Sequence, residues 1–325
     1  MNKRQQTRKP VVTVVVVPRE SFNMFPAVIQ RIYSVTPPIF KMLVMEGHAP
    51  EPIRKELRRL QKTRDRCNVV WSDRWLYPHE AVNQAILLID TEFVVFIDND
   101  VEVVEGWLEA LVSCAQEEKV GCVHPIYLTT KLSNPKRKIH VAEGKLVRKE
   151  VNGKQFIDTV MTYSGVSLKD YPDQKRKPSD YFEWHCVLFS KRLLEKIGPL
   201  DDLNIAEHLD YVFRMEKAGE RILLEPKAVV AYDYERIFEF RGADREYMFY
   251  RWNVEKSEAS LKRFAQKWNL APESTARRLY WVKEHTAKVR QTYLVPRVVN
   301  RLRRLAGLGP RPFVKEPKPE VLTVA

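Results

Sequence analysis

The run Phe93-Val94-Val95-Phe96-Ile97 ends in three polar residues, Asp98-Asn99-Asp100, and this junction constrains the fold more than any other segment of the chain. Five successive apolar, β-branched or aromatic residues are typical of a strand that is buried on both faces. Residues two apart in an extended chain face the same side, so Asp98 and Asp100 are predicted to point together. Two carboxylates at the end of a buried strand need water, a cation or a polar ligand to stabilise their charge.

The triplet by itself also fits a solvated turn, because Asp and Asn are common turn residues. A calcium loop of the EF-hand type is a poorer fit, since Val103 stands at the sixth position, where that loop needs glycine. Paired carboxylates at the carboxyl end of a central strand instead favour a hard divalent cation and a phosphate-bearing ligand.

Strands and helices alternate along the first part of the chain, which predicts a largely parallel sheet with helices on both faces. We expect strands at 11–17, 40–45, 68–72 and 93–97, and helices at 25–34, 51–64, 79–88 and 106–116. The pattern changes after residue 128, where Asn152-Gly153 is a hairpin turn signal and residues 163–181 have the composition of a long loop. Residues 247–305 have a helical, amphipathic pattern.

The net charge of +13 lies at the ends of the 325-residue chain. Residues 1–10 contribute +4, residues 277–308 contribute +8 and residues 309–325 contribute +1, so residues 11–276 sum to zero. A nucleic-acid enzyme more often carries such charge on its working face, and nucleic acid is therefore an unlikely partner. The basic C-terminal helix is predicted either to lie on an anionic membrane surface or to pack on the rest of the protein with its charges in solvent.

The cysteines at positions 67, 114, 122 and 186 show no CxxC spacing, so we expect reduced, packed thiols and no zinc site. No apolar run approaches the roughly 20 residues that span a bilayer. The basic first ten residues lead into an apolar stretch too short for a signal peptide. We therefore expect a cytoplasmic location, with peripheral attachment to the inner face of a membrane as the alternative.

Several motifs in this order resemble the family 2 glycosyltransferases of GT-A fold. They are Val44-Met45-Glu46-Gly47, Asp98-Asn99-Asp100, Ile197-Gly198-Pro199-Leu200-Asp201 and Glu207-His208-Leu209-Asp210, with Arg214, Gly219 and Pro226 after them. The resemblance covers roughly residues 11–235. It implies an α/β fold with a mixed, mostly parallel sheet, in a catalytic domain at 11–235. We expect a basic, disordered segment at 1–10, a helical, basic extension at 236–308 and a disordered tail at 309–325.

The resemblance implies inverting, metal-dependent transfer of a sugar to a hydroxyl acceptor, with Mg²⁺ or Mn²⁺ as the cofactor. The donor would be a UDP-, GDP- or dTDP-linked sugar, and the acceptor a glycan or a lipid-linked molecule of surface-glycan synthesis. A divalent cation would stabilise the charge that builds on the departing diphosphate. By resemblance, the donor-binding residues are Pro18, Glu46, Asn83, Asp98 and Asp100, and the metal ligands are Asp98, Asp100 and Asp233.

The helix that begins near residue 207 departs from the family pattern, because Glu207-His208 stands where two acids are usual. We expect Glu207 or His208 to be the general base and Asp210 to be structural or acceptor-binding, since Asp210 is also spaced to pair with Arg214.

Trp184 and His185 lie where the family often contacts the acceptor. Trp184 is predicted to be either a sugar-stacking platform or a buried core residue. Because Pro18 is not followed by the usual Thr-Tyr-Asn, a non-catalytic nucleotide- or glycan-binding protein on a degenerate GT-A scaffold is the alternative function.

Overall fold

A computed structural model describes residues 10–232, 243–293 and 305–307. The largest element is a mixed sheet with the strand order β10-β12-β6-β11-β4-β1-β2-β3, on which β5 pairs with β12 and β7 pairs with β6. The strands are β1 (Val12–Val17), β2 (Phe40–Met45), β3 (Cys67–Val70), β4 (Phe93–Asp98), β5 (Val101–Val103), β6 (Cys122–Leu128), β7 (Ile139–Val141), β10 (Lys177–Ser179), β11 (Cys186–Ser190) and β12 (Ile222–Tyr232).

The parallel part of the sheet places the polar triplet at its carboxyl edge. Strand β1 pairs in parallel with β2 and with β4, in a register that sets Val17 opposite Asp98. All six residues of β1 and all six of β4 are buried, which confirms the strands predicted from their apolar runs.

Strand β11 lies between β4 and β6 and is antiparallel to both. Strand β12 is continuous, with an irregularity in its register between Leu224 and Val229. Pro226 lies within that irregularity, where a residue without an amide hydrogen is tolerated. The sheet is therefore mixed and mostly parallel, as the sequence indicated.

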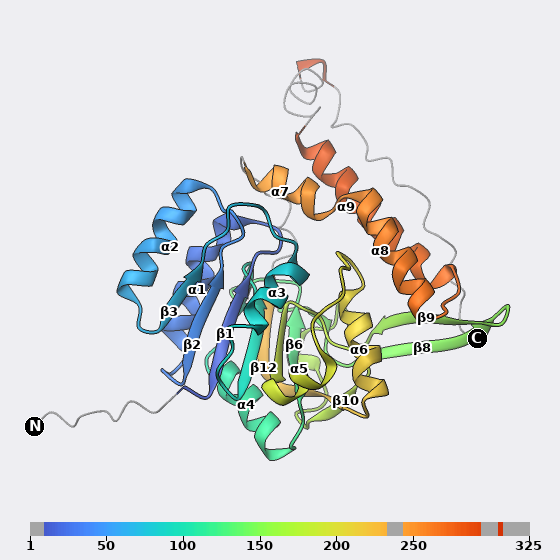
Figure 1. The fold of residues 1–325 in the computed structure, drawn as a ribbon, viewed down its shortest axis with the longest axis horizontal. Coiled ribbons are helices and arrows are strands. Elements are labelled where there is room, and N and C mark those ends of the chain that lie inside the picture. Colours follow the sequence, from blue (N-terminus) through green and yellow to red (C-terminus); the bar gives the residue numbers. More distant parts are fainter. Residues whose placement is uncertain (1–9, 233–242, 294–304, 308–325) are drawn as a thin grey trace, which may run out of the picture.

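Helices pack on both faces of the sheet (Figure 1). They are α1 (Phe25–Val35), α2 (Glu51–Thr63), α3 (Pro78–Ile86), α4 (Trp107–Glu117), α5 (Lys191–Ile197) and α6 (Glu207–Lys217). Helix α1 contacts α2, and α3 contacts β1 and β2. All four cysteines are buried and free, as expected.

The C-terminal helices are α7 (Ala243–Arg251), α8 (Val254–Lys267) and α9 (Glu273–Tyr293). They lie beside the sheet together with a separate hairpin of β8 (Gly144–Val151) and β9 (Lys154–Met161), which turns at Asn152-Gly153 as predicted (Figure 1). In α7, the Asp244 carboxylate accepts a hydrogen bond of 2.8 Å from the backbone N–H of Phe22. The helical extension therefore packs directly on the loop that follows β1.

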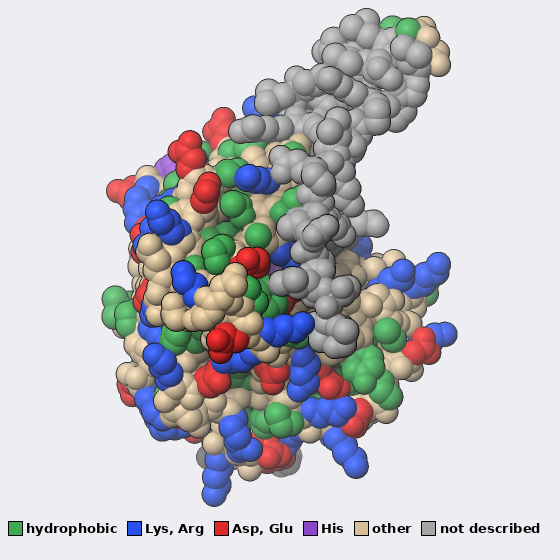
Figure 2. Space-filling view, turned by 90° about the vertical axis from the view of Figure 1, so that its right-hand side faces the viewer, with side chains coloured by type: hydrophobic (Ala, Val, Ile, Leu, Met, Phe, Trp, Pro, Cys, Tyr) green, Lys and Arg blue, Asp and Glu red, His purple; other side chains and the backbone are tan. Residues whose placement is uncertain are grey.

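Within the described ranges, no helix has the length and apolar character needed to cross a bilayer. Figure 2 shows basic and acidic side chains interspersed over one face of the molecule. The expectation that nucleic acid is not a partner remains a prediction. Residues 1–9, 294–304 and 308–325 lie outside the described residues, and so do most of the basic ends predicted to meet a membrane or to be disordered.

Candidate active site

The end of β4 is fixed by contacts with β11 and with the loop after β1. The Oδ2 atom of Asp98 lies 2.9 Å from Nδ1 of His185, and the Asp98 backbone N–H donates to the His185 carbonyl at 3.1 Å. The Asn99 side chain accepts from the Arg19 backbone N–H at 2.9 Å and donates to the Ser21 carbonyl at 2.6 Å. These bonds hold the loop after β1 against the two aspartates.

Asp100 has the features of a cation ligand. Its side chain is 6% exposed, and Oδ1 is buried with no hydrogen-bond partner among the described residues. Burial, followed by the negative charge of Asp98, raises the pKa of Asp100 to about 7. An unpaired carboxylate oxygen in such a place is stabilised by a hard cation.

A divalent metal fits the chemistry of this edge. Across the parts of the chain that the structure describes, no group of three His, Cys, Asp or Glu side chains is gathered into a complete metal site. The protein would therefore supply the Asp100 and Asp98 carboxylates, and the remaining ligands would come from a bound diphosphate and water, as is usual for Mg²⁺. Asp233, the third predicted ligand, lies outside the described residues.

A cavity of about 650 Å³ opens in front of Asp100. Its lining comes from the loop after β1, from the residues preceding β11, from the start of α6, and from β9 and α9. Within it are Arg19, Glu20, Asp100, His140, Glu183, Trp184, His185, Glu207, His208, Tyr232, Arg251, Arg278 and Trp281. A volume of this size can hold a nucleotide-sized ligand.

Glu207 is the predicted base that faces this cavity beside the aspartates. It is the first residue of α6, and Ala206 before it adopts a left-handed conformation with φ of 66°. The Glu207 carboxylate lies 3.8 Å from Nη1 of Arg19, whose Nε is 3.7 Å from Asp98. Arg19 therefore lies between the predicted donor-side carboxylate and the predicted base.

His208 also lines the cavity. Burial, together with the nearby positive charges of Arg278 and Arg19, lowers its pKa well below the ordinary value of 6.5. The imidazole is therefore neutral at physiological pH but is a weak base. This environment favours Glu207 over His208 for proton abstraction.

Asp210 does not face the cavity. It is 1% exposed and turns toward α8, where Oδ1 accepts from the Trp268 indole N–H at 2.8 Å and lies 2.7 Å from Nζ of Lys267. Its Oδ2 atom is 3.2 Å from Nε of Arg214, the pairing that the sequence spacing allowed. Asp210 joins α6 to α8, and this geometry supports the structural role rather than the catalytic one.

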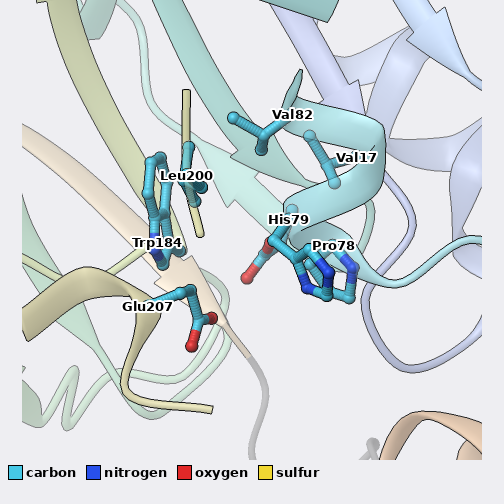
Figure 3. A pocket seen from close by; sticks show the side chains of 8 residues that line it. Val17, Pro78, His79, Val82, Trp184, Leu200 and Glu207 are labelled. Carbon is cyan, nitrogen blue, oxygen red and sulfur yellow. The ribbon is translucent and has the colours of Figure 1, made fainter. Parts of the chain in front are cut away.

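Trp184 lies at the margin of the site. Its ring packs against Phe96, Phe182 and Phe189, and its indole nitrogen is buried with no partner among the described residues. Trp184 and Glu207 also line a much smaller cavity with Pro78 and His79 of α3 (Figure 3). Trp184 is thus a core residue with one edge at the site.

His185 lies on the Asp98 side of the site, because it contacts Asp98 and stacks on Tyr232 at 4.0 Å between ring centroids. Acceptor contact by Trp184 or His185 remains a prediction.

Three predicted donor-binding residues lie elsewhere. The Glu46 carboxylate is fully buried and accepts from the backbone N–H groups of His48, Ala49 and Ser72, with Arg54 at 3.3 Å. It organises the loop after β2 and does not reach the large cavity.

Asn83 exchanges two hydrogen bonds with the backbone of Leu200, at 2.8 and 2.9 Å, and joins α3 to the segment before α6. Pro18 is buried against Gly47, where an added Cβ would come within 2.8 Å of the proline ring. The structure gives these residues local packing roles, and donor contact by them stays a prediction.

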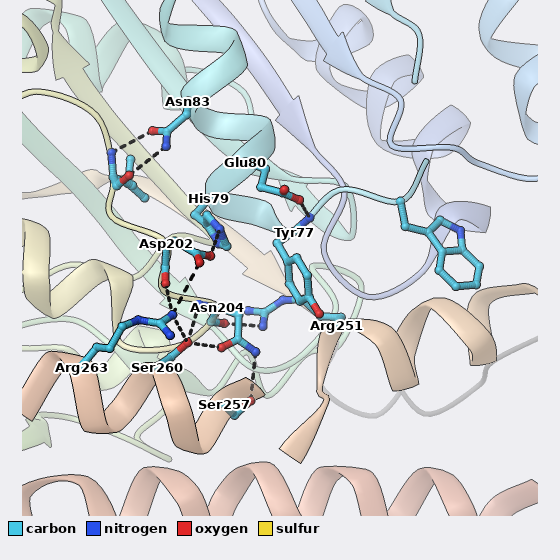
Figure 4. A network of polar contacts seen from close by, with 12 residues as sticks. Tyr77, His79, Glu80, Asn83, Asp202, Asn204, Arg251, Ser257, Ser260 and Arg263 are labelled. Carbon is cyan, nitrogen blue, oxygen red and sulfur yellow. Dashed lines mark hydrogen bonds and ion pairs between the residues drawn. The ribbon is translucent and has the colours of Figure 1, made fainter. Parts of the chain in front are cut away.

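A network of polar contacts joins the loop before α6 to the C-terminal helices α7 and α8 (Figure 4). Asn204 bonds to Ser257 and Ser260 of α8, and its carbonyl accepts a hydrogen bond of 2.6 Å from Nη1 of Arg251. All four residues are buried. The C-terminal helices therefore fix the loop that presents Glu207.

Sequence reasoning missed Arg19, Glu183 and Arg278. Arg19 directly follows Pro18 at the end of β1, and its place at a strand end was a usable signal. Burial raises the pKa of the Glu183 carboxyl, which lines the cavity just before Trp184. Arg278 reaches the cavity from α9, a contact that only the tertiary fold creates.

The fold and the site together define the class of protein. A mixed sheet whose central strand ends in two aspartates, with Asp100 lining a large cavity together with Glu207 at the start of α6, has the architecture of the GT-A glycosyltransferases. The sequence model described as "Glycosyl transferase family 2" matches residues 13–198. The chain belongs to glycosyl transferase family 2.

Individual relatives match this chain at low sequence identity. The chain is 27% identical over 159 residues to the pre-mycofactocin glycosyltransferase of Mycobacterium tuberculosis, a match that covers 48% of this chain and 30% of that protein. It is 23% identical over 231 residues to human polypeptide N-acetylgalactosaminyltransferase 6, covering 67% of this chain and 36% of that protein. The matches thus span about a third of the length of these relatives.

Two solved structures share the fold. GalNAc-T7, crystallised with UDP, GalNAc and Mn²⁺, superposes with a TM-score of 0.55 at 14% identity, covering 89% of this chain and 58% of that one. The mannosyltransferase PcManGT of Pyrobaculum calidifontis, in complex with GDP-Man and Mn²⁺, gives a TM-score of 0.53 at 17% identity, covering 93% of this chain and 81% of that one.

Proposed function

We propose that this protein is an inverting, metal-dependent glycosyltransferase that moves a sugar from a nucleoside diphosphate to a hydroxyl acceptor. The observation that carries the proposal is that one cavity is lined both by Asp100, whose buried Oδ1 atom has no hydrogen-bond partner among the described residues, and by the Glu207 carboxylate. The family membership supports it, and so do the UDP and Mn²⁺ bound to GalNAc-T7 and the GDP-Man and Mn²⁺ bound to PcManGT.

In this mechanism, Glu207 accepts the proton of the acceptor hydroxyl as that oxygen bonds to the anomeric carbon. The bond from that carbon to the diphosphate breaks in the same displacement, so the configuration inverts. A Mg²⁺ or Mn²⁺ ion held by Asp100 and Asp98 would supply neutralisation of the charge on the departing diphosphate.

Arg19 places a positive charge between Asp98, the predicted donor-side carboxylate, and Glu207, the predicted base. Its guanidinium lies 3.7 Å from Asp98 and 3.8 Å from Glu207, and burial keeps its interactions with charge strong. We assign it to orienting Glu207 and to offsetting negative charge when a diphosphate enters.

Nucleotide binding tests the metal site. Wild-type protein is titrated with UDP and GDP, each with and without Mn²⁺, by isothermal calorimetry. Asp100→Asn is expected to raise the Kd measured with Mn²⁺ at least tenfold, because the variant loses a charged oxygen ligand. Asp158→Asn is the matched control, since Asp158 also lines the cavity but is bonded to Arg277 on the far wall, at 2.8 Å.

Equal metal dependence in Asp100→Asn and wild type would contradict the assigned ligand. Slow hydrolysis of a UDP- or GDP-sugar separates the enzyme from the alternative, a non-catalytic binder on the same scaffold. An enzyme releases sugar at a rate that Glu207→Gln reduces, whereas a binder shows nucleotide affinity without hydrolysis.

A further inference from the structure

One wall of the large cavity that Asp100 lines comes from β9 and α9, and α9 lies beyond the residues that match the family model. Hydrogen bonds hold this wall in place. The Ile157 N–H donates to the Ser274 hydroxyl at 3.1 Å, and Arg277 bonds to Asp158 at 2.8 Å. The Thr286 hydroxyl donates to the Trp252 carbonyl at 3.1 Å. The surface that faces the predicted base is thus held in place before any ligand enters.

An aromatic side chain with an accessible surface is built into this wall. Trp281 is 39% exposed although it lines the cavity. Its ring meets Trp252 edge to face at 5.2 Å, and it lies 4.3 Å from the His285 ring. These contacts fix the indole, so a flat ligand can stack on it at little cost in side-chain entropy.

The charges around the cavity restrict what can bind there. Seven carboxylates and four guanidiniums line it: Glu20, Asp100, Asp158, Glu183, Glu207, Glu273 and Glu284 against Arg19, Arg251, Arg277 and Arg278. Arg277 is paired with Asp158, and Arg251 donates to the Asn204 carbonyl. The excess of acid disfavours a second phosphate beside that of the donor, whereas carboxylates accept hydrogen bonds from hydroxyl groups.

We propose that the β9–α9 wall is an acceptor subsite for an uncharged saccharide, one ring of which stacks on Trp281. The inference rests on the proposed function, because it assigns the acceptor class of the same site. The acceptor hydroxyl would then lie between this wall and Glu207, since both face the one cavity.

Direct binding tests the proposal independently of turnover. Saturation-transfer NMR with maltose, cellobiose, lactose and diacetylchitobiose is expected to show binding by wild-type protein of at least one of them. Trp281→Ala should weaken that binding about three- to tenfold, the range for loss of an aromatic contact, and Trp281→Phe should restore part of it. Trp71→Ala is the matched control, because Trp71 is 37% exposed but does not line the cavity.

The same preparations are titrated with UDP and GDP in Mn²⁺, where Trp281→Ala should match wild type. Equal saccharide binding by Trp281→Ala and Trp71→Ala overturns the subsite. So does preference for glucose 6-phosphate over glucose, or no binding of any neutral saccharide. If wild-type protein binds neither UDP nor GDP, the proposed function is overturned instead. Failure of the subsite and failure of the proposed function are therefore distinguishable.

Discussion

Replacement of Asp210 by Asn separates the structural and catalytic interpretations of the α6 motif. The carboxylate is 1% exposed and contacts Trp268, Lys267 and Arg214. Removing one partner of a buried charge pair costs about 3–5 kcal/mol. Lys267 is 35% exposed and Arg214 is 18% exposed, so water recovers part of that loss, and Asn keeps one hydrogen bond. We expect a loss of about 2 kcal/mol in the free energy of unfolding.

The assay combines urea unfolding, thermal unfolding and turnover. A loss of about 2 kcal/mol should lower Tm by about 3 °C, because the entropy of unfolding scales with the 325 residues of the chain. Because Asp210 does not line the cavity, turnover per folded molecule should stay within about threefold of wild type. Asp201→Asn is the matched control, since its exposed carboxylate contacts the same Lys267 nitrogen at 2.8 Å and should cost less than about 1 kcal/mol.

The opposite pattern would refute this reasoning. If Asp210→Asn unfolds like wild type but loses turnover, the carboxylate acts on the reacting groups, and its contacts with α8 do not determine its role. If Asp201→Asn and Asp210→Asn destabilise equally, burial of Asp210 contributes nothing beyond a surface ion pair.

Three further predictions follow from other sites. Glu207→Gln should lower kcat by about 10²–10⁴ with nucleotide affinity unchanged, and a larger loss in His208→Asn would make His208 the base. His124 is buried, and burial lowers its pKa to about 4. Between pH 6.5 and 4 the unfolded chain therefore binds more protons than the native protein, so the free energy of unfolding falls as the pH drops through that window. The free energy of unfolding should decrease by about 2 kcal/mol more between pH 8 and 5 in wild type than in His124→Gln, measured by urea titration; equal slopes would exclude His124. Gly144→Ala should cost about 1–3 kcal/mol in the same assay, because its Cβ would lie 2.6 Å from the Tyr181 carbonyl oxygen; wild-type stability would mean that this contact relaxes freely.

The parts of the fold that could be predicted are those in which local pattern and burial agree. The runs at 12–17 and 93–98 are apolar except for Thr13 and Asp98, and both are fully buried strands. The antiparallel place of β11 could not be predicted, because Cys186–Ser190 is an apolar run whose composition is equally compatible with either direction.

The position of Asp100 in the cavity was predictable, because Asp100 comes two residues after the end of β4. The role of a polar side chain was not predictable where two outcomes are possible. Such a side chain can either form hydrogen bonds within the protein or contact a ligand. Glu46 and Asn83 are the residue types that bind donors, but backbone N–H and carbonyl groups already occupy them. Trp281 and Arg278 reach the cavity only because α9 packs against the β8–β9 hairpin, and no local signal carries that contact.

The position of β11 has a consequence for biosynthesis. Strand β4 has β1 on one side and β11 on the other, and the partners Phe93 and Ser190 are almost a hundred residues apart in the chain. During translation β4 therefore has an open edge until residue 190 has left the ribosome, and an unpaired apolar strand favours association between nascent chains. Truncation before β11 should thus yield aggregates rather than a smaller folded unit, and chaperone demand should be greatest over this interval of synthesis.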